Sequence, residues 1–236
     1  MSQRIRQLFL TILHREPNGE EANSAAGFVD HIQSEQTAGG AEGWNYGYGT
    51  FDEGTAAVTK FTVFPWSADG TWQGGKTMPD PSLGWTSLQK AGGHPGGNLN
   101  FCAIRRWTAD VDCRVILNSV IGHLKEEGDG VRFRILTEGK GVIADVEAHN
   151  STAPTKAETL DIRAGQQIDF VADCRTNESH DSFRCTIMIT QMVKGKVQRV
   201  WSSEKDFRDQ ASENRLNAWA QLAQALLLTN EFVFVD

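Results

Sequence analysis

Residues 131–136 have the sequence Val-Arg-Phe-Arg-Ile-Leu, and residues 167–174 have the sequence Gln-Ile-Asp-Phe-Val-Ala-Asp-Cys. Val131, Phe133 and Ile135 alternate with the side chains between them, which is the two-residue period of a strand with one buried face. Residues 167–174 follow the same alternation. Glycine-containing turns, such as residues 127–130, separate stretches of this kind. The pattern indicates antiparallel strands that are joined by short turns.

Ten segments in the middle of the chain share this strand-like pattern. They cover residues 44–50, 57–64, 101–107, 113–121, 131–137, 142–148, 157–163, 167–174, 183–193 and 196–203. Eight to ten antiparallel strands without helices between them are typical of a β-sandwich, and we expect a jelly roll. The predicted fold class is therefore mainly β.

The two ends of the chain have a helical period instead. Apolar residues recur every three or four positions in residues 3–15 and again after Asp206, and Asn18 is suited to cap a second helix over residues 19–36. Because a short amphipathic helix is not stable alone, we expect the terminal helices to pack together. The expected domains are an N-terminal helical segment (1–38), a jelly-roll sandwich (41–205) and a C-terminal helix that packs with the N-terminal segment (206–236).

The composition of the 236 residues excludes several classes of partner. Hydrophobic residues make up 39% and charged residues 22%, which is ordinary for a globular protein. The formal charge of −7 argues against binding to nucleic acid or to an anionic membrane surface. No apolar run approaches the roughly 20 residues that span a bilayer, so we expect no membrane span.

Residues 64–98 interrupt the strand rhythm and are rich in tryptophan and glycine. We expect an ordered loop over the sandwich, because disordered segments avoid large aromatic residues. Flat aromatic faces pack against the C–H faces of sugar rings, while amides and charged groups bond the hydroxyls. The candidate ligand-binding residues are Trp66, Trp72, Gln73, Lys76, Asp80, Trp85 and His94, with Trp44 and Tyr46 as neighbours. Two alternatives remain: the tryptophans cover the core, and His94 serves a structural turn.

A resemblance to a known family rests mainly on the C-terminal residues 216–236, Leu-Asn-Ala-Trp-Ala-Gln-Leu-Ala-Gln-Ala-Leu-Leu-Leu-Thr-Asn-Glu-Phe-Val-Phe-Val-Asp. This stretch resembles the end of planctomycete-type proteins that have an N-terminal cytochrome c domain and two domains of unknown function. Residues 4–17 look like a helix from the last of those domains. Inside the insert, the matching motifs are Trp85, Gly92-Gly-His-Pro-Gly96, Ala103-Ile-Arg-Arg-Trp107, Gly128-Asp-Gly-Val-Arg132, Ile168-Asp-Phe-Val171 and Asp181-Ser-Phe183.

The resemblance implies an inserted β module that is similar to a carbohydrate-binding module. It also implies an extracytoplasmic location, periplasmic or at the cell surface, and a parent protein that carries haem elsewhere. The haem-attachment motif is missing from this chain, so we expect the chain itself to be haem-free. The family carries over no catalytic residues.

Acidic turns raise the question of a bound cation. Asp129, Asp173 and Asp181, with Glu178, offer the oxygen ligands that calcium requires, so a structural calcium ion is one expectation. The alternative is that these are the ordinary acidic turns of an acidic protein. No EF-hand loop is present in the sequence.

The cysteines leave the redox state open. Strand phase places Cys102 and Cys113 on different faces, which disfavours a bridge between them. Cys174 and Cys185 point inward on strands that we expect to be neighbours, so a disulfide bond or two buried thiols would fit. No CxxC motif is present in the sequence.

The sequence contains no catalytic signature: no Gly-x-Ser-x-Gly, no His-Glu-x-x-His and no phosphate loop. We therefore expect a noncatalytic polysaccharide-binding module of a larger redox-associated protein. The alternative is a structural or docking module that contacts domains of the parent protein and has no glycan ligand. A glycan binder should expose tryptophan faces in a groove, and a docking module should expose a flat apolar patch.

Overall fold

The computed structural model describes residues 3–38, 43–208 and 218–229. The chain forms two compact units, one from residues 1–40 with 214–236 and one from residues 41–213. The second unit extends past residue 205, the end that the sequence predicts for it. Among the described helices, none has the length and apolar character needed to cross a membrane.

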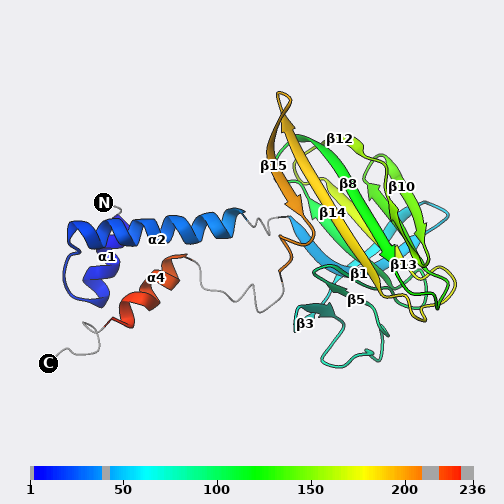
Figure 1. Ribbon diagram of the computed structural model, residues 1–236, viewed down its shortest axis with the longest axis horizontal. Helices are drawn as coiled ribbons and strands as arrows, with labels where there is room; N and C mark the ends of the chain where they lie inside the picture. The colour runs from blue at the N-terminus through cyan, green and yellow to red at the C-terminus, as the bar shows by residue number, and fades with distance from the viewer. Residues whose placement is uncertain (1–2, 39–42, 209–217, 230–236) are drawn as a thin grey trace. The chain divides into compact units, whose positions relative to one another are not determined.

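The helical unit is built from both ends of the chain (Figure 1). Its helices are α1 (Gln3–Ile12), α2 (Gly19–Ala38) and α4 (Ala218–Leu227). Their apolar faces share one small core, whose buried members are Ile5, Phe9, Ala25, Val29, Ala218, Leu222 and Leu226. The expectation that the terminal helices pack together is confirmed.

Helix α2 begins with a reciprocal cap. The Glu21 N–H donates to the Asn18 side-chain oxygen at 2.9 Å, and the Asn18 N–H donates to the Glu21 carboxylate at 2.7 Å. This arrangement satisfies two backbone donors that the first helical turn leaves free. The predicted cap at Asn18 is therefore confirmed.

The larger unit is a β-sandwich of two antiparallel sheets, which confirms the mainly β, jelly-roll fold class (Figure 1). One sheet has the strand order β10-β9-β13-β7-β1-β2, and we call it sheet A. Sheet B has the order β11-β8-β14-β6-β5-β4-β3, with β12 also on β8 and β15 also on β14.

The strands have the following bounds. Those of sheet A are β1 (Trp44–Asp52), β2 (Ala57–Val63), β7 (Cys102–Thr108), β9 (Val131–Thr137), β10 (Gly141–Ala148) and β13 (Gln167–Asp173). Those of sheet B are β3 (Trp66–Ala68), β4 (Thr71–Gln73), β5 (Ser87–Gln89), β6 (Gly92–His94), β8 (Cys113–His123), β11 (Ser151–Pro154), β12 (Glu158–Ile162), β14 (Phe183–Val193) and β15 (Lys196–Ser202).

The expectation of a strand-free loop over residues 64–98 is wrong. This segment forms the short strands β3, β4, β5 and β6, which extend sheet B from β14 to one edge. Each of these strands has three residues, which is too short to show a two-residue period in the sequence.

The main core lies between the two sheets. Trp107 and Trp201 are almost fully buried there, and their rings meet edge to face at 5.0 Å between centroids. The neighbouring arginines behave as their strand phase predicts, on opposite faces. Arg105 is buried and donates to the backbone carbonyls of residues 89, 92 and 203, whereas Arg106 forms a bidentate ion pair with Asp169.

All four cysteines are free in the described structure, so no disulfide bond joins Cys174 to Cys185. Cys102, Cys174 and Cys185 are buried. Burial raises the pKa of the Cys102 and Cys185 thiols to about 12. These two thiols are therefore protonated and unreactive at neutral pH.

Candidate functional site

The short strands of the tryptophan-rich segment create a polar surface on the outer face of sheet B. Cross-strand pairing places Thr71 opposite Gln89, Gln89 opposite Gly92, Gly92 opposite Arg184, and Arg184 opposite Gly122. Directly opposite residues point to the same face of a sheet. These five residues therefore form one row across five strands.

A second polar row lies beside the first. Gln73 is opposite Ser87, and Ser87 is opposite His94. Each is two residues from its neighbour in the first row, so it lies on the same face. The inner face of the same strands carries Trp72 and Leu88, which belong to the core. The segment thus has one apolar face and one polar face.

The two rows line an open cavity of about 790 Å³. Its lining residues are Thr71, Gln73, Met78, Trp85, Ser87, Gln89, Ala91, Gly92, Gly93, His94, Gly122, Leu124, Lys125, Ser182, Phe183 and Arg184. A smaller cavity of about 320 Å³ adjoins it and is lined by Trp85, His94, Glu178, Ser179, His180 and Ser182. Trp85, His94 and Ser182 line both cavities, and we call the combined depression the groove.

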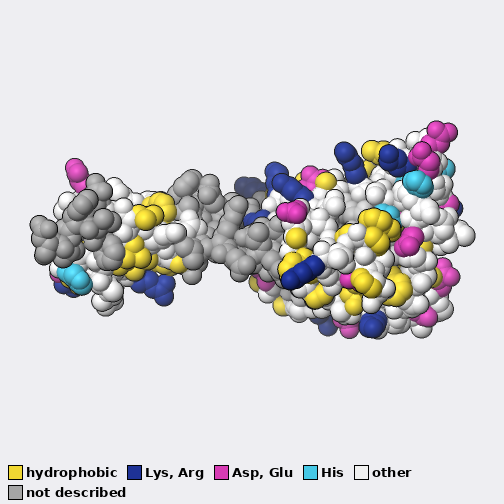
Figure 2. Space-filling view, turned by 90° about the horizontal axis from the view of Figure 1, so that it is seen from below, with side chains coloured by type: hydrophobic (Ala, Val, Ile, Leu, Met, Phe, Trp, Pro, Cys, Tyr) yellow, Lys and Arg dark blue, Asp and Glu magenta, His cyan; other side chains and the backbone are white. Residues whose placement is uncertain are grey.

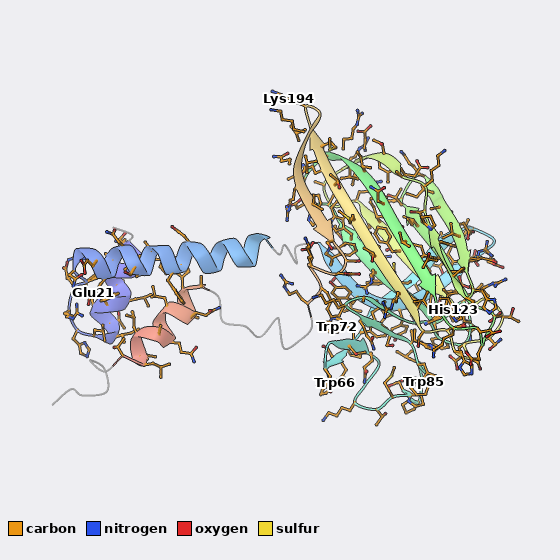
Figure 3. The ribbon with its side chains drawn as sticks, viewed as in Figure 1. Glu21, Trp66, Trp72, Trp85, His123 and Lys194 are labelled. Atoms are coloured by element: carbon orange, nitrogen blue, oxygen red, sulfur yellow. The ribbon has the colours of Figure 1, made fainter. Side chains whose placement is uncertain are left out.

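Trp85 is the exposed aromatic residue of the groove. Its side chain is 46% exposed, and its ring centroid lies 6.4 Å from that of His94. Figure 3 shows Trp85 and Trp66 at the lower edge of the sandwich, whereas Trp72 lies closer to the sheets. Figure 2 looks at this edge, where hydrophobic side chains lie exposed beside basic ones. Trp85 therefore offers a flat apolar surface to a ligand.

The His94 side chain is fixed by a contact with the next residue of its turn. Its Nδ1 lies 2.6 Å from the carbonyl oxygen of Pro95. Burial lowers the pKa of His94, although the Pro95 carbonyl and the Glu178 carboxylate act in the opposite direction. A neutral imidazole with Nδ1–H donated to Pro95 leaves Nε2 as an acceptor for a hydroxyl donor.

The backbones of Gly92 and Phe183 approach so closely that the first row has no side chain at Gly92. A Cβ atom added at Gly92 would lie 1.9 Å from the carbonyl oxygen of Phe183. No side chain fits at that point, so a glycine is required there. The floor of the groove beside Arg184 therefore carries no side chain at Gly92, because the strand pairing itself excludes one.

The prediction that Trp44, Tyr46 and Trp72 bind a ligand is wrong, because these residues lie in the core. Trp44, Tyr46 and Trp72 are 7%, 5% and 6% exposed. The indole N–H of Trp72 donates to the carbonyl of Arg208 at 2.5 Å, and the Tyr46 ring stacks beside the Trp72 ring. For these residues the alternative holds: they cover the core.

Trp66, Lys76 and Asp80 lie outside both cavities. The Lys76 Nζ lies 5.3 Å from the centroid of the half-buried Trp66 ring, a cation–π contact. The Asp80 carboxylate accepts the backbone N–H groups of Ser82 and Leu83, both at 2.9 Å. Asp80 thus stabilises a turn. Of the predicted ligand-binding residues, Gln73, Trp85 and His94 line the groove.

The acidic residues that suggested calcium have separate roles. Asp173 forms a buried ion pair with Arg134, and Asp129 accepts the N–H of Thr176 at 3.0 Å. Asp181 is fully buried, and its Oδ1 lies 3.6 Å from Nε2 of His123. The described residues contain no group of three or more His, Cys, Asp or Glu that could hold a metal ion. Calcium binding stays a prediction.

Asp181 is the least satisfied polar side chain near the groove. Neither carboxylate oxygen has a hydrogen-bond partner within the described structure. Burial raises the pKa of Asp181 to about 7, and the nearby Asp129 carboxylate acts in the same direction. Its neighbours Glu178, Ser179, His180 and Ser182 line the smaller cavity, so Asp181 lies directly under the groove wall.

Several groove residues were not predicted from the sequence, chiefly Arg184, Ser182, Lys125, Ser87 and Gln89. Ser182 and Arg184 belong to an alternating stretch whose exposed face was recognisable. Strand β6, which pairs with β14, was not recognisable in the sequence, because residues 92–94 are two glycines and one histidine. Only the pairing of β6 with β14 brings these residues together with Trp85.

No protein-family model matches this chain, and no curated protein matches it. Solved structures to which it is similar include the CBM51-2 and INT domains of Clostridium perfringens ZmpB in complex with GlcNAc, at 16% identity and a TM-score of 0.27, over 34% of this chain and 18% of that chain.

Two further similar structures are the C-terminal CBM6 of LamC from Zobellia galactanivorans and the C-terminal domain of EclA, named as a sugar-binding protein. The first has 14% identity and a TM-score of 0.25, over 42% of this chain and 76% of that chain. The second has 16% identity and a TM-score of 0.29, over 42% of this chain and 69% of that chain.

Proposed function

We propose that this protein is a noncatalytic polysaccharide-binding module and that the groove on sheet B is its binding surface. The observation that supports this most strongly is the position of Trp85, which is 46% exposed at the edge of two rows of polar side chains. An apolar ring face beside convergent hydrogen-bonding groups is the combination that a sugar ring requires.

The dimensions of the groove suit an extended ligand. Neighbouring strands lie about 4.8 Å apart, so a row across five strands spans roughly 19 Å. The first row runs from β4 to β8 over this distance. Amide and hydroxyl groups from Gln89, Thr71 and Ser182 both donate and accept hydrogen bonds, as sugar hydroxyls do.

The groove lacks the acid pair of a glycosidase. Canonical glycoside hydrolysis uses two carboxyl groups on either side of the scissile bond. Among the described residues that line the two cavities, Glu178 is the single carboxylate. Asp181 is close in sequence but fully buried. The donor set of the groove therefore favours binding without hydrolysis.

The proposed setting is a larger extracytoplasmic redox protein. It is supported by the resemblance of residues 4–17 and 216–236 to planctomycete-type cytochrome c domain proteins. An antibody against this chain should detect a haem-staining polypeptide in the extracytoplasmic fraction of the source cells. Detection of a haem-free cytoplasmic polypeptide would contradict this setting.

Affinity electrophoresis on a panel of plant and algal polysaccharides tests the binding function. The wild-type chain should be retarded by at least one polysaccharide, and Trp85→Ala should lose that retardation. Trp66→Ala is the matched control, because Trp66 lies outside both cavities. If no polysaccharide retards the wild type, or if Trp85→Ala behaves as the wild type does, the proposal fails.

Docking to another protein is the second candidate, and a different surface favours it. Val120, Met188 and Val200 are each more than 40% exposed. Strand pairing places them on the outer face of β8, β14 and β15, the same face as Arg184. An apolar patch of this kind is typical of an interaction surface. Glycan binding that survives Met188→Lys would separate the groove from this patch.

A further inference from the structure

The larger cavity of the groove has a charge opposite to that of the whole protein. The chain has a formal charge of −7. The residues that line this cavity include Lys125 and Arg184 but, within the described structure, no aspartate and no glutamate. Glu178 lines the smaller cavity, on the other side of Trp85 and His94. The groove therefore has one cationic side and one anionic side.

Arg184 differs from the other arginines on the strands. The others donate hydrogen bonds to acceptors of the protein, either backbone carbonyls or carboxylates; they are Arg105, Arg106, Arg114, Arg132, Arg134 and Arg199. Arg184 is exposed and has no acceptor within the described part of the chain. Its five donors are therefore free for a ligand.

The strand pairing explains why Arg184 has no acceptor among the described residues. Gly92 lies opposite it on β6 and Gly122 lies opposite it on β8, so neither neighbour has a side chain on that face. In the ion pair of Arg106 with Asp169, by contrast, the two residues face each other directly across β7 and β13. The row Gly92-Arg184-Gly122 presents a guanidinium group on an open floor.

Lys125 adds a second positive charge to the same cavity. It is exposed, lies two residues after the end of β8 and lines the larger cavity. Two cations that converge on one cavity favour an anionic group there, and a guanidinium binds planar or tetrahedral oxyanions through two parallel hydrogen bonds. Because both cations are exposed, added salt should weaken this attraction.

We infer that the groove selects acidic polysaccharides, with a carboxylate or a sulfate ester of one sugar bound at Arg184 while another sugar stacks on Trp85. This inference rests on the proposed polysaccharide-binding function. Arg184 lies two strands from β5, roughly 10 Å across the sheet. Trp85 lies two residues before β5 and four residues before Gln89, the β5 residue in the row of Arg184. This adds roughly 13 Å along the strand, so sugars of one chain that are a few units apart can contact both side chains.

The test compares each charged polysaccharide with its uncharged form, using the full chain. Polygalacturonate is paired with fully methyl-esterified pectin, and carrageenan is paired with chemically desulfated carrageenan. Affinity is measured for the wild type, Arg184→Gln, Lys125→Gln, Trp85→Ala and the control Arg163→Gln. Arg163 is exposed in a turn between β12 and β13, so its substitution changes the net charge equally without touching the groove.

The wild type should bind one charged form about tenfold or more tightly than its uncharged partner, as expected for a charge-assisted hydrogen-bond pair. Arg184→Gln should abolish most of this preference, Lys125→Gln should reduce it, and Arg163→Gln should leave it intact. Preference for polygalacturonate identifies a carboxylate ligand, and preference for carrageenan identifies a sulfate ester.

Two results would overturn the inference in distinguishable ways. If the wild type binds charged and uncharged forms equally while Trp85→Ala loses both, the acidic specificity is wrong and the proposed function stands. If no form binds the wild type, the inference fails, and the proposed function fails with it when no polysaccharide of the wider panel retards the wild type either. An equal loss of preference in Arg184→Gln and Arg163→Gln would show a net-charge effect and would also contradict a site at Arg184.

Discussion

The two faces of strands β4, β5 and β6 have opposite chemistry although they come from the same tryptophan-rich segment. On the inner face, Trp72 is 6% exposed and its indole N–H is bonded to Arg208. On the outer face, Trp85 is 46% exposed beside polar side chains. Tryptophan content alone therefore does not identify a binding residue; the phase of each residue within its strand does.

The same alternation continues along the approach to β14. Asp181, Phe183 and Cys185 are buried, whereas Ser182 and Arg184 are exposed and line the groove. Residues that stabilise the fold and residues that are available to a ligand thus alternate along one stretch of chain. Substitutions on the inner face should change stability, and substitutions on the outer face should change binding.

Trp72→Ala should have the largest effect. Removal of a buried tryptophan leaves a cavity and an unpaired carbonyl at Arg208, so we expect a loss of about 3–5 kcal/mol in the free energy of unfolding. Urea unfolding measures this loss. Trp85→Ala is the matched variant on the outer face and should cost less than about 1 kcal/mol. Equal losses would contradict the assignment of the two faces.

Asp181→Asn should change the pH dependence of stability. Burial raises the pKa of Asp181 to about 7 in the folded protein, whereas an unfolded aspartate titrates near about 3.9. Between these values the folded state binds more protons, so this carboxyl group makes the free energy of unfolding fall as the pH rises. Below and above this window its contribution is constant.

Urea unfolding at pH values from about 4 to about 8, the window set by the two pKa values, checks this expectation. The difference in stability between wild type and Asp181→Asn should shift in favour of the variant as the pH rises. Asp161→Asn is the control, because Asp161 is exposed and paired with Arg114, which lowers its pKa. Parallel pH curves for wild type and Asp181→Asn would show that Asp181 ionises normally.

Trp85→Ala should reduce glycan affinity about tenfold or more, the usual cost of removing an aromatic anchor from a binding surface. Isothermal titration calorimetry with the polysaccharide of the panel that binds most tightly measures the change in affinity. Trp66→Ala should leave affinity within about twofold, because Trp66 is outside the groove and contacts Lys76. If both variants lose affinity equally, the binding surface is wider than the groove.

Met188→Lys should have the smallest effect. Met188 is 44% exposed on the outer face of β14, away from the groove lining. A surface substitution of this kind changes stability by less than about 0.5 kcal/mol. Urea unfolding and glycan titration should both match the wild type. Loss of glycan binding in Met188→Lys would extend the binding surface along β14.

The regular strands could be predicted from the sequence because each is long enough to repeat its period. Strand β14 has eleven residues and β8 has eleven, and both were located correctly. The sandwich and the packed terminal helices follow from such long elements, since their burial patterns extend over many residues.

The groove could be predicted only in part. Gln73, Trp85 and His94 were identified from composition, but Trp72 was assigned the same role although it points the other way. Strands β4, β5 and β6 contain three residues each, and their order depends on pairing with β14, a contact between distant parts of the sequence. The prediction that Trp44 and Tyr46 contact a ligand was avoidable, because these residues alternate with Asn45 and Gly47 on a recognisable strand.

Titration of the ¹⁵N-labelled chain with a binding polysaccharide tests the central claim most directly, because each tryptophan indole N–H gives its own signal. Substitution assigns the signals of Trp85 and Trp72. The Trp85 signal should shift on binding, and the Trp72 signal, whose indole is buried and bonded to Arg208, should stay in place. A stationary Trp85 signal in the presence of bound glycan would contradict the account.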